Sequence, residues 1–294
     1  MINKKKISTI CLGSANFGFR YGINKKKAIK NKDITKILEY ANKENINFID
    51  TAVNYKNSEK KIGLINKYNL KIITKLPKIP KKIINVEKWI INKIKKSCIK
   101  LKINNLYGVL VHDTTELKNK MRSKKIYKAF DYLLKNKIVK KIGLSIYDPN
   151  ELNLFFKKYD YQIIQAPLNI FDRRLISSGW GQKLLKKDVE IFARSVFLKG
   201  LLLRDVDKIP KHFLKWNQKF IDFDKWVKKK NISKVEACIR FIKSFKEIKK
   251  IIVGINDLEQ LKKNVIYLKK SKLSAPKNLS VSSGLILNPR KWKI

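Results

Sequence analysis

The stretch Asn47-Phe48-Ile49-Asp50-Thr51-Ala52-Val53-Asn54-Tyr55 decides the fold of this chain, because a short apolar run ends there in a carboxylate and a tyrosine follows. Two later runs have the same design. Leu70-Lys71-Ile72-Ile73-Thr74-Lys75 ends in a lysine, and Leu106-Tyr107-Gly108-Val109-Leu110-Val111-His112 ends in a histidine. Polar groups at the ends of successive buried strands are typical of barrel enzymes, whose chemistry collects at one end of the barrel. The pattern predicts one site that contains Asp50, Tyr55, Lys75 and His112, called the tetrad below.

Short β-branched runs alternate along the chain with longer Lys-rich segments of helical period, which indicates an α/β protein with a parallel sheet. Eight such runs favour a closed, parallel, eight-stranded (β/α)8 barrel, or TIM barrel, which typically needs ~250 residues. The 294 residues therefore predict one domain, 1–294, with an irregular tail from about residue 274. The expected strands are 7–12, 47–49, 71–74, 108–111, 141–144, 161–164, 189–193 and 250–253.

The first run continues into Ser58-Glu59 and Ile62-Gly63, and with the strand-end lysine and histidine in this order it resembles the signature of the aldo-keto reductases. The resemblance extends from about Ile10 to Asn264. It implies the same barrel and an NAD(P)H-dependent reduction of an aldehyde or ketone. Members of that family often begin with a hairpin that closes the barrel floor. Only a few residues precede the first expected strand here, so we expect this N-terminal hairpin plug to be short or absent.

The charge balance is strongly basic, with 69 Lys+Arg against 23 Asp+Glu and a formal net charge of +46. Such a balance can signal a polyanion partner. Here the lysines are spread over every segment and mixed with Ile and Asn, instead of being gathered in one patch beside aromatic residues. We therefore do not expect a nucleic-acid partner. A polyanion-binding protein stays an alternative, which a steep fall of affinity with salt would support.

Cysteine usage indicates neither a disulfide framework nor a metal site, because Cys11, Cys98 and Cys238 lie far apart without Cys-x-x-Cys spacing. The start lacks the continuous apolar core of a signal peptide, and no apolar run approaches the ~20 residues of a membrane span. We expect a cytoplasmic protein without a metal or a membrane contact. Nothing in the pattern indicates an oligomeric state.

Reduction of a carbonyl by hydride leaves negative charge on its oxygen, so the site needs a proton donor within hydrogen-bond reach. The resemblance implies that Tyr55 is this general acid, that the Lys75 ammonium lowers the pKa of its phenol, and that Asp50 keeps Lys75 charged. It also implies that His112 donates or relays a hydrogen bond to the carbonyl oxygen. Each residue alone has an ordinary alternative, such as an N-cap for Asp50 or a surface position for Tyr55. The four together, in this order and at strand ends, favour the catalytic interpretation.

None of these four side chains supplies hydride, so the chemistry requires a nicotinamide cofactor. No Gly-x-Gly-x-x-Gly follows a strand, and the resemblance implies a dinucleotide that lies extended across the rim of the barrel. Ser145 and Gln165 match the positions that hold the nicotinamide carboxamide. The cofactor positions implied by the resemblance are Ser14, Ser145, Gln165, Arg194, Ser195, Phe197, Leu198, Gly200, Gly254, Asn256, Gln260 and Asn264.

Two positions depart from the family pattern. Ile146 stands where an asparagine is common, which removes one polar contact to the carboxamide, and Arg194 stands where many relatives have an aromatic ring against the nicotinamide. A guanidinium can stack on that ring, and its charge would disfavour the oxidised, positively charged cofactor. Gly200 in the run 195–201 resembles the close approach of a pyrophosphate loop, and the run 252–257 resembles the start of a helix beside the adenosine phosphate.

The choice of dinucleotide rests on the resemblance, which favours NADPH and leaves NADH open. The basic residues that bind the 2′-phosphate in some relatives are replaced here by Gly254 and Gln260. Lys262 and Lys263 are candidate substitutes, but lysines are so common in this chain that their presence decides little.

The substrate is expected to be a small carbonyl compound, with a sugar-like or hydroxylated one as a candidate class. Its pocket depends on rim loops, for which the candidates are Phe17, Phe19, Tyr21, Asn54, Trp180 and the segment 210–223. The alternative function is a redox sensor or regulatory subunit that binds the cofactor and turns over slowly. The departures at Ile146 and Arg194 leave this alternative open, whereas a complete tetrad argues against it.

Overall fold

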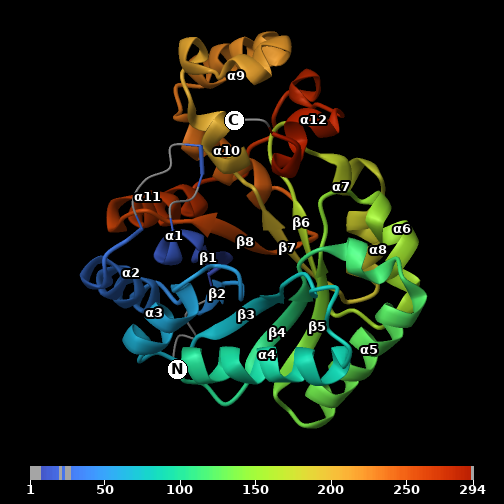
Figure 1. Ribbon diagram of the computed structural model, residues 1–294. Helices are drawn as coiled ribbons and strands as arrows, with labels where there is room; N and C mark the ends of the chain where they lie inside the picture. The colour runs from blue at the N-terminus through green and yellow to red at the C-terminus, as the bar shows by residue number, and fades with distance from the viewer. Residues whose placement is uncertain (1–7, 20–21, 24–27, 293–294) are drawn as a thin grey trace.

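The strands form a closed barrel in the computed structural model, which describes residues 8–19, 22–23 and 28–292. They follow sequence order around the ring, and every neighbouring pair is parallel (Figure 1). The ring closes because the first strand pairs with the last, with Ile10 opposite Ile251 and Gly13 opposite Gly254. The predicted α/β fold, a parallel (β/α)8 barrel, is confirmed. The strands are β1 (Ile10–Gly13), β2 (Phe48–Asp50), β3 (Lys71–Leu76), β4 (Leu106–Val111), β5 (Val139–Ser145), β6 (Ile163–Pro167), β7 (Glu190–Arg194) and β8 (Ile248–Gly254).

Each expected strand overlaps an observed one, and the differences lie at the ends. β6 continues past the expected end at residue 164, because Gln165 and Ala166 still pair with Phe192 and Ala193 of β7. β1 begins at Ile10. The first expected strand residue, Ile7, lies outside the described residues, and so does the place of any N-terminal hairpin plug.

Helices cover the outside of the barrel, and several begin where the sequence offers a capping side chain. Asn85 accepts a hydrogen bond from the Lys88 amide at the start of α4, and Asn119 does the same for Arg122 at the start of α5. The covered faces are apolar, as in the buried Ile34-Ile37-Leu38-Ala41 stripe of α2. The α-helices are α1 (Ala15–Gly18), α2 (Asn31–Lys43), α3 (Ser58–Ile65), α4 (Val86–Leu101), α5 (Lys120–Lys135), α6 (Asn150–Phe155), α7 (Arg174–Ser177), α8 (Trp180–Lys186), α9 (Asn217–Lys229), α10 (Lys234–Lys243), α11 (Leu258–Lys269) and α12 (Gly284–Leu287).

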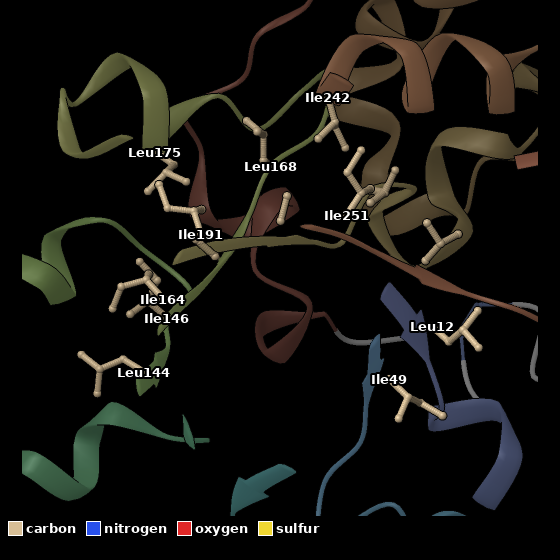
Figure 2. Packing of buried hydrophobic residues seen from close by; sticks show 14 of the residues in the cluster. Leu12, Ile49, Leu144, Ile146, Ile164, Leu168, Leu175, Ile191, Ile242 and Ile251 are labelled. Atoms are coloured by element: carbon tan, nitrogen blue, oxygen red, sulfur yellow. The ribbon is translucent and has the colours of Figure 1, made fainter. Parts of the chain in front are cut away.

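Apolar side chains pack on both faces of the strands. Outside the barrel, Figure 2 shows Leu175 of α7 next to Ile191 of β7, and Ile242 of α10 beside Ile251 of β8. Strands that are buried on both faces need continuous apolar runs rather than an alternating pattern, which explains the sequence signal. The barrel interior is filled by Cys11, Phe48, Ile73, Leu110, Ile163, Phe192 and Ile252.

Extra structure separates β7 from β8. The short 3-10 helices η3 (Leu198–Leu203), η4 (Val206–Lys208) and η5 (Lys211–Trp216) lead into α9, which lies outside α10 in Figure 1. The predicted interruption at residues 210–223 falls in η5 and α9. Phe220 of α9 anchors this extension, because its ring lies 5.2 Å from that of Phe171.

The tail after α11 returns to the mouth of the barrel. It was expected to be irregular, but it contains η6 (Lys277–Leu279), α12 and η7 (Pro289–Lys291). The Arg173 guanidinium donates to the carbonyl oxygens of Ala275 and Pro276 at 3.2 and 2.7 Å. The Val281 amide donates to the Phe171 carbonyl oxygen at 2.8 Å. These bonds fix the tail against the β6–α7 connection. In the described part of the chain, no helix combines the length and apolarity that crossing a membrane requires.

Candidate active site

The four tetrad side chains meet at the C-terminal end of the barrel. Asp50 ends β2, Lys75 lies near the end of β3, and His112 directly follows β4. Tyr55 lies in the loop between β2 and α3. All four line the same cavity, which has a volume of about 500 Å³. Because apolar side chains fill the interior below, the strand ends are where polar chemistry is accessible.

Asp50 and Lys75 form a buried ion pair. The Lys75 ammonium, on a residue that is only 1% exposed, donates to both Asp50 carboxylate oxygens at 2.7 Å and to the Thr51 carbonyl oxygen at 2.8 Å. An ammonium group has three N–H donors, and these three acceptors use all of them. Either charge alone would be costly to bury, so each group compensates the other.

Aromatic contacts hold Tyr55 beside this pair. The Lys75 Nζ lies 5.1 Å from the centroid of the Tyr55 ring, and the rings of His112 and Phe19 lie at centroid distances of 6.2 and 5.8 Å. Backbone also approaches closely, because a Cβ at Gly18 would lie 1.9 Å from the Tyr55 carbonyl oxygen. Only glycine lets α1 pack against the loop that carries Tyr55.

The surroundings of the Tyr55 phenol favour its protonated form. Burial raises its pKa, and the Asp50 carboxylate raises it further, while Arg194 acts in the opposite direction. The pKa is thus raised, against the expectation of a lowered one, because burial and Asp50 outweigh the opposite effect of Arg194. The three N–H groups of Lys75 are bound to Asp50 and Thr51, so none of them donates to the phenol in this structure.

His112 is held as a neutral imidazole at neutral pH. Burial and the positive charges of Lys75, Arg194 and Arg290 lower its pKa to about 3, although Asp113 opposes them. A neutral imidazole has one N–H donor and one acceptor nitrogen. The ring can therefore donate a hydrogen bond to a carbonyl oxygen without bringing a positive charge into the cavity.

Buried hydroxyl groups fix the strand ends beneath the tetrad. Ser14, which is completely buried, donates from Oγ to the Asp50 carbonyl oxygen at 2.9 Å, and Ser58 Oγ donates to Ser14 Oγ at 2.8 Å. The buried Glu59 carboxylate accepts from Thr74 Oγ1 at 2.8 Å. The Ser58-Glu59 part of the signature thus holds β2 and β3 in place. Ser14 lines the cavity, but its hydroxyl is used in this network.

The expected carboxamide contacts lie next to Asp50. Gln165 Nε2 donates to Asp50 Oδ1 at 2.8 Å, and Ser145 Oγ lies 3.5 Å from Gln165 Oε1. Ile146 does not face the cavity, because its side chain is completely buried in the outer apolar layer, beside Ile164 in Figure 2. The backbone carbonyl oxygen of Ile146 accepts a hydrogen bond from Arg194 Nη2 at 2.7 Å. Ile146 therefore contacts the site only indirectly, by holding the Arg194 guanidinium.

The loop after β7 turns sharply and leaves open space beside its backbone. Ser195, Lys199 and Gly200 have φ angles of +57°, +54° and +94°. No atom would lie within 4 Å of a Cβ at Gly200, so a ligand has room to approach the main chain. Arg194, Ser195, Phe197, Lys199 and Gly200 line the cavity. Leu198 does not, because the turn directs its side chain into the apolar core, and its prediction as a cofactor contact is corrected here.

The far end of the cavity lies between β8 and α11. Gly254 has open space where a Cβ would be. The Asn256 amide and Nδ2 donate to Gln260 Oε1, both at 3.1 Å, and Asn16 Nδ2 donates to Asn256 Oδ1 at 2.7 Å. Gly254, Asn256, Gln260 and the buried Asn264 all line the cavity that holds the tetrad. One continuous space therefore connects the tetrad with the predicted adenosine end.

The two candidate lysines for a 2′-phosphate differ in position. Lys262 Nζ lies 2.8 Å from Glu259 Oε1 on the surface of α11, and its residue does not line the cavity. Lys263 does line it. Lys263 is thus the candidate that can meet a bound anion.

Some of the predicted rim residues lie near the site, and others lie elsewhere. Phe19 contacts Tyr55, and Asn54 is exposed on the same loop. Phe17 is a completely buried core residue, and Trp180 packs on Phe156, so neither forms the rim and both predictions are wrong. No residue of 210–223 lines the cavity, and Tyr21 lies outside the described residues.

Sequence reasoning missed several residues at the site, among them Tyr147 and Arg290. Tyr147 lines the cavity two positions after Ser145, and its place just beyond a strand end was a usable signal. Arg290 reaches the site from η7, where its Nη2 donates to the His112 carbonyl oxygen at 3.2 Å. No periodic pattern marks the tail, so nothing in the sequence pointed to Arg290. A search of the described residues finds no cluster of three or more metal-ligating side chains.

Comparisons with known proteins agree with this geometry. The model of the aldo/keto reductase family matches residues 9–281. Aldo-keto reductase AKR11C1 from Bacillus halodurans, in its holo form, is similar with a TM-score of 0.72 and 17% identity over 91% of this chain and 89% of that one. Its apo form has a TM-score of 0.68 and 18% identity, over 92% and 87% of the two chains.

A third structure, of the Pseudomonas aeruginosa protein PA4992, has a TM-score of 0.66 and 17% identity over 89% and 90% of the two chains. A comparison with curated protein sequences finds no match. At these identities the structures establish the fold, and the family model establishes the family.

Proposed function

Because this chain belongs to the aldo/keto reductase family, a family of NAD(P)H-dependent oxidoreductases, we propose that it reduces an aldehyde or ketone by direct hydride transfer with Tyr55 as general acid. One observation carries the proposal. The tetrad lines a cavity that continues without interruption to the β8–α11 residues expected to hold a dinucleotide. A proton donor and a groove for a hydride carrier are the two parts that carbonyl reduction needs.

The tetrad supplies the proton and the hydrogen bonds. The raised pKa of Tyr55 keeps its phenol protonated at neutral pH, so the proton is present when a carbonyl arrives. As negative charge develops on the carbonyl oxygen and the proton moves, a phenolate forms. Lys75 then stabilises it by turning one N–H away from Thr51. Neutral His112 donates a hydrogen bond to the same carbonyl oxygen.

The residues along the cavity fit an extended dinucleotide. A bound nicotinamide supplies the hydride. Ser145 and Gln165 would hold its carboxamide, with Gln165 exchanging its hydrogen bond to Asp50 for one to the ligand. Arg194 would stack on the ring, and the open backbone at Gly200 would receive the pyrophosphate. Lys263 at the far end favours NADPH, whose 2′-phosphate it would contact.

The test is a titration of the protein with NADPH and with NADH, followed by nicotinamide fluorescence. A panel of small aldehydes, hydroxylated ones included, is then added while consumption of the reduced cofactor is measured. Binding with turnover supports the reductase and identifies its cofactor. Binding without turnover across the panel favours the redox-sensor alternative. No binding of either dinucleotide would overturn the cofactor assignment.

A further inference from the structure

Tyr147 lines the cavity, and two guanidinium groups contact its ring. The Cζ atoms of Arg194 and Arg290 are each 4.1 Å from the centroid of its ring. The three side chains, called the Tyr147 cluster below, come from the loop after β5, the end of β7 and the tail.

The backbone around the cluster is fixed by hydrogen bonds. The Tyr147 amide donates to Glu151 Oε1 at 2.7 Å, and Arg174 Nη2 donates to the Tyr147 carbonyl oxygen at 3.0 Å. Arg290 is held by Asp113, at 3.3 Å from Nη1, and by the carbonyl oxygen of His112. The cluster is therefore a preformed feature that places two fixed charges next to the tetrad.

Positive charge exceeds negative charge at this end of the cavity. Arg194 donates only to neutral acceptors, Ser195 Oγ and the Ile146 carbonyl, and its buried Nε has no hydrogen-bond partner in the described part of the chain. Burial alone would raise the pKa of Tyr147, yet Arg194, Arg290 and Lys199 together lower it. The carboxylates nearby are already paired, since Asp50 binds Lys75 and Asp113 binds Arg290.

We propose that the Tyr147 cluster binds an anionic group, a carboxylate or phosphate, that is carried by the carbonyl substrate. Tyr147 and Arg194 line the cavity, whereas Arg290 borders it through the Tyr147 ring and the His112 carbonyl oxygen. Arg290 is the contact to test, because its side chain is 41% exposed. Its planar fork suits the two oxygens of such an anion. This inference rests on the proposed reductase function and narrows its substrate to an aldehyde or ketone that carries a carboxylate or phosphate. Arg194 belongs both to the cluster and to the predicted cofactor contacts, whereas Arg290 is not a predicted cofactor contact. A variant of Arg290 therefore tests substrate recognition separately from dinucleotide binding.

The test compares matched pairs of aldehydes. 4-Carboxybenzaldehyde is paired with its methyl ester, and glyceraldehyde 3-phosphate with glyceraldehyde, for the wild type, Arg290→Gln, Arg290→Lys and Lys291→Gln. Lys291 is the exposed neighbour of Arg290 and serves as the matched control for loss of a tail cation. We expect the wild type to prefer the anionic member of a pair. Arg290→Gln should raise the KM of that member about tenfold to hundredfold, Arg290→Lys should raise it less, and Lys291→Gln should leave it unchanged.

The two pairs also identify the anion that the site binds. If Arg290→Gln raises the KM only of 4-carboxybenzaldehyde, the site binds a carboxylate. If it raises only that of glyceraldehyde 3-phosphate, the site binds a phosphate, and an effect on both means that it binds either anion. An equal loss for charged and neutral aldehydes would show a structural role and overturn the inference. So would a weaker binding of NADPH by Arg290→Gln, or no preference in the wild type. Reduction of the neutral aldehydes in those cases leaves the reductase function standing.

If no aldehyde is reduced at all, the proposed function fails, and the anion site is tested by calorimetry of benzoate and inorganic phosphate on the protein–NADPH complex. Binding that Arg290→Gln abolishes would support the site. Absence of binding would overturn it.

Discussion

Lys75 binds both carboxylate oxygens of Asp50 at 2.7 Å, and its remaining N–H goes to a backbone carbonyl, so the ion pair is complete without Tyr55. The arrangement makes Tyr55 a protonated phenol beside a saturated ammonium group. In the proposed reaction, proton transfer from Tyr55 would require one lysine hydrogen bond to be exchanged. The buried ion pair joins the ends of β2 and β3, and in the proposed reaction Lys75 would also stabilise the phenolate.

Removing one member of this pair should cost more than removing both. Lys75→Met leaves the buried Asp50 carboxylate without compensation, which should lower the free energy of unfolding by about 3–5 kcal/mol. Asp50→Asn combined with Lys75→Met removes the charge and should recover most of that loss. Urea unfolding of both variants measures the difference. Equal stabilities would mean that the ion pair is not the buried, tightly coupled unit described here. Both variants should lack reductase activity.

His112 should destabilise the folded protein in mild acid. Its pKa is about 3 in the folded protein and about 6.5 in the unfolded chain. Between these values the unfolded chain binds a proton that the folded protein does not, so stability falls as the pH falls from about 6.5 toward 3. The slope is at most about 1.4 kcal/mol per pH unit.

The measurement for His112 is the unfolding free energy at pH 7 and pH 4.5. His112→Gln should reduce the loss of stability between these two pH values. The kcat/KM profile should also lack an ionisation near pH 6.5. A clear ionisation there that His112→Gln removes would contradict the neutral imidazole.

Lys263 should distinguish NADPH from NADH. Lys263→Gln is expected to raise the Kd of NADPH about tenfold, equivalent to about 1.4 kcal/mol, because a charge-assisted bond to the 2′-phosphate is lost. The Kd of NADH should not change. Lys262→Gln is the matched control, because Lys262 pairs with Glu259 away from the cavity. The same fluorescence titration measures all four values, and equal effects of the two variants would refute the assignment.

Gly18 should be required for the position of Tyr55. In Gly18→Ala the new Cβ would lie 1.9 Å from the Tyr55 carbonyl oxygen, so the loop must move. We expect at least a tenfold loss of kcat, because a small displacement of a proton donor is costly. Gly284→Ala is the control, since the nearest atom to its Cβ would be 3.7 Å away. Full activity of Gly18→Ala would show that the loop tolerates the shift.

The barrel and the tetrad could be predicted because their signals are local. Each strand is a short apolar run, and Asp50, Lys75 and His112 lie at or just beyond the ends of such runs. The chain order of parallel strands then brings them to one end of the barrel. Leu198 was misassigned because only the positive φ angles of its loop reveal that the side chain turns inward.

Contacts between residues far apart in the chain could not be predicted from the sequence. Arg290 reaches His112 only because the tail folds back across the barrel mouth, and no helical or strand period in that tail signals a return. The direction of the Tyr55 pKa was also misjudged, because burial and the nearby Asp50 carboxylate raise it. The depth of burial of a loop residue cannot be predicted from the sequence pattern.

The central claim is that Tyr55 donates the proton in carbonyl reduction. The most direct test is a single-turnover measurement of NADPH oxidation by an aldehyde, for the wild type and for Tyr55→Phe, with the cofactor saturating. The account predicts that Tyr55→Phe binds NADPH normally and loses about 100-fold to 10,000-fold in the rate of oxidation. An unchanged rate in Tyr55→Phe would contradict the account, because the proton would then come from another group.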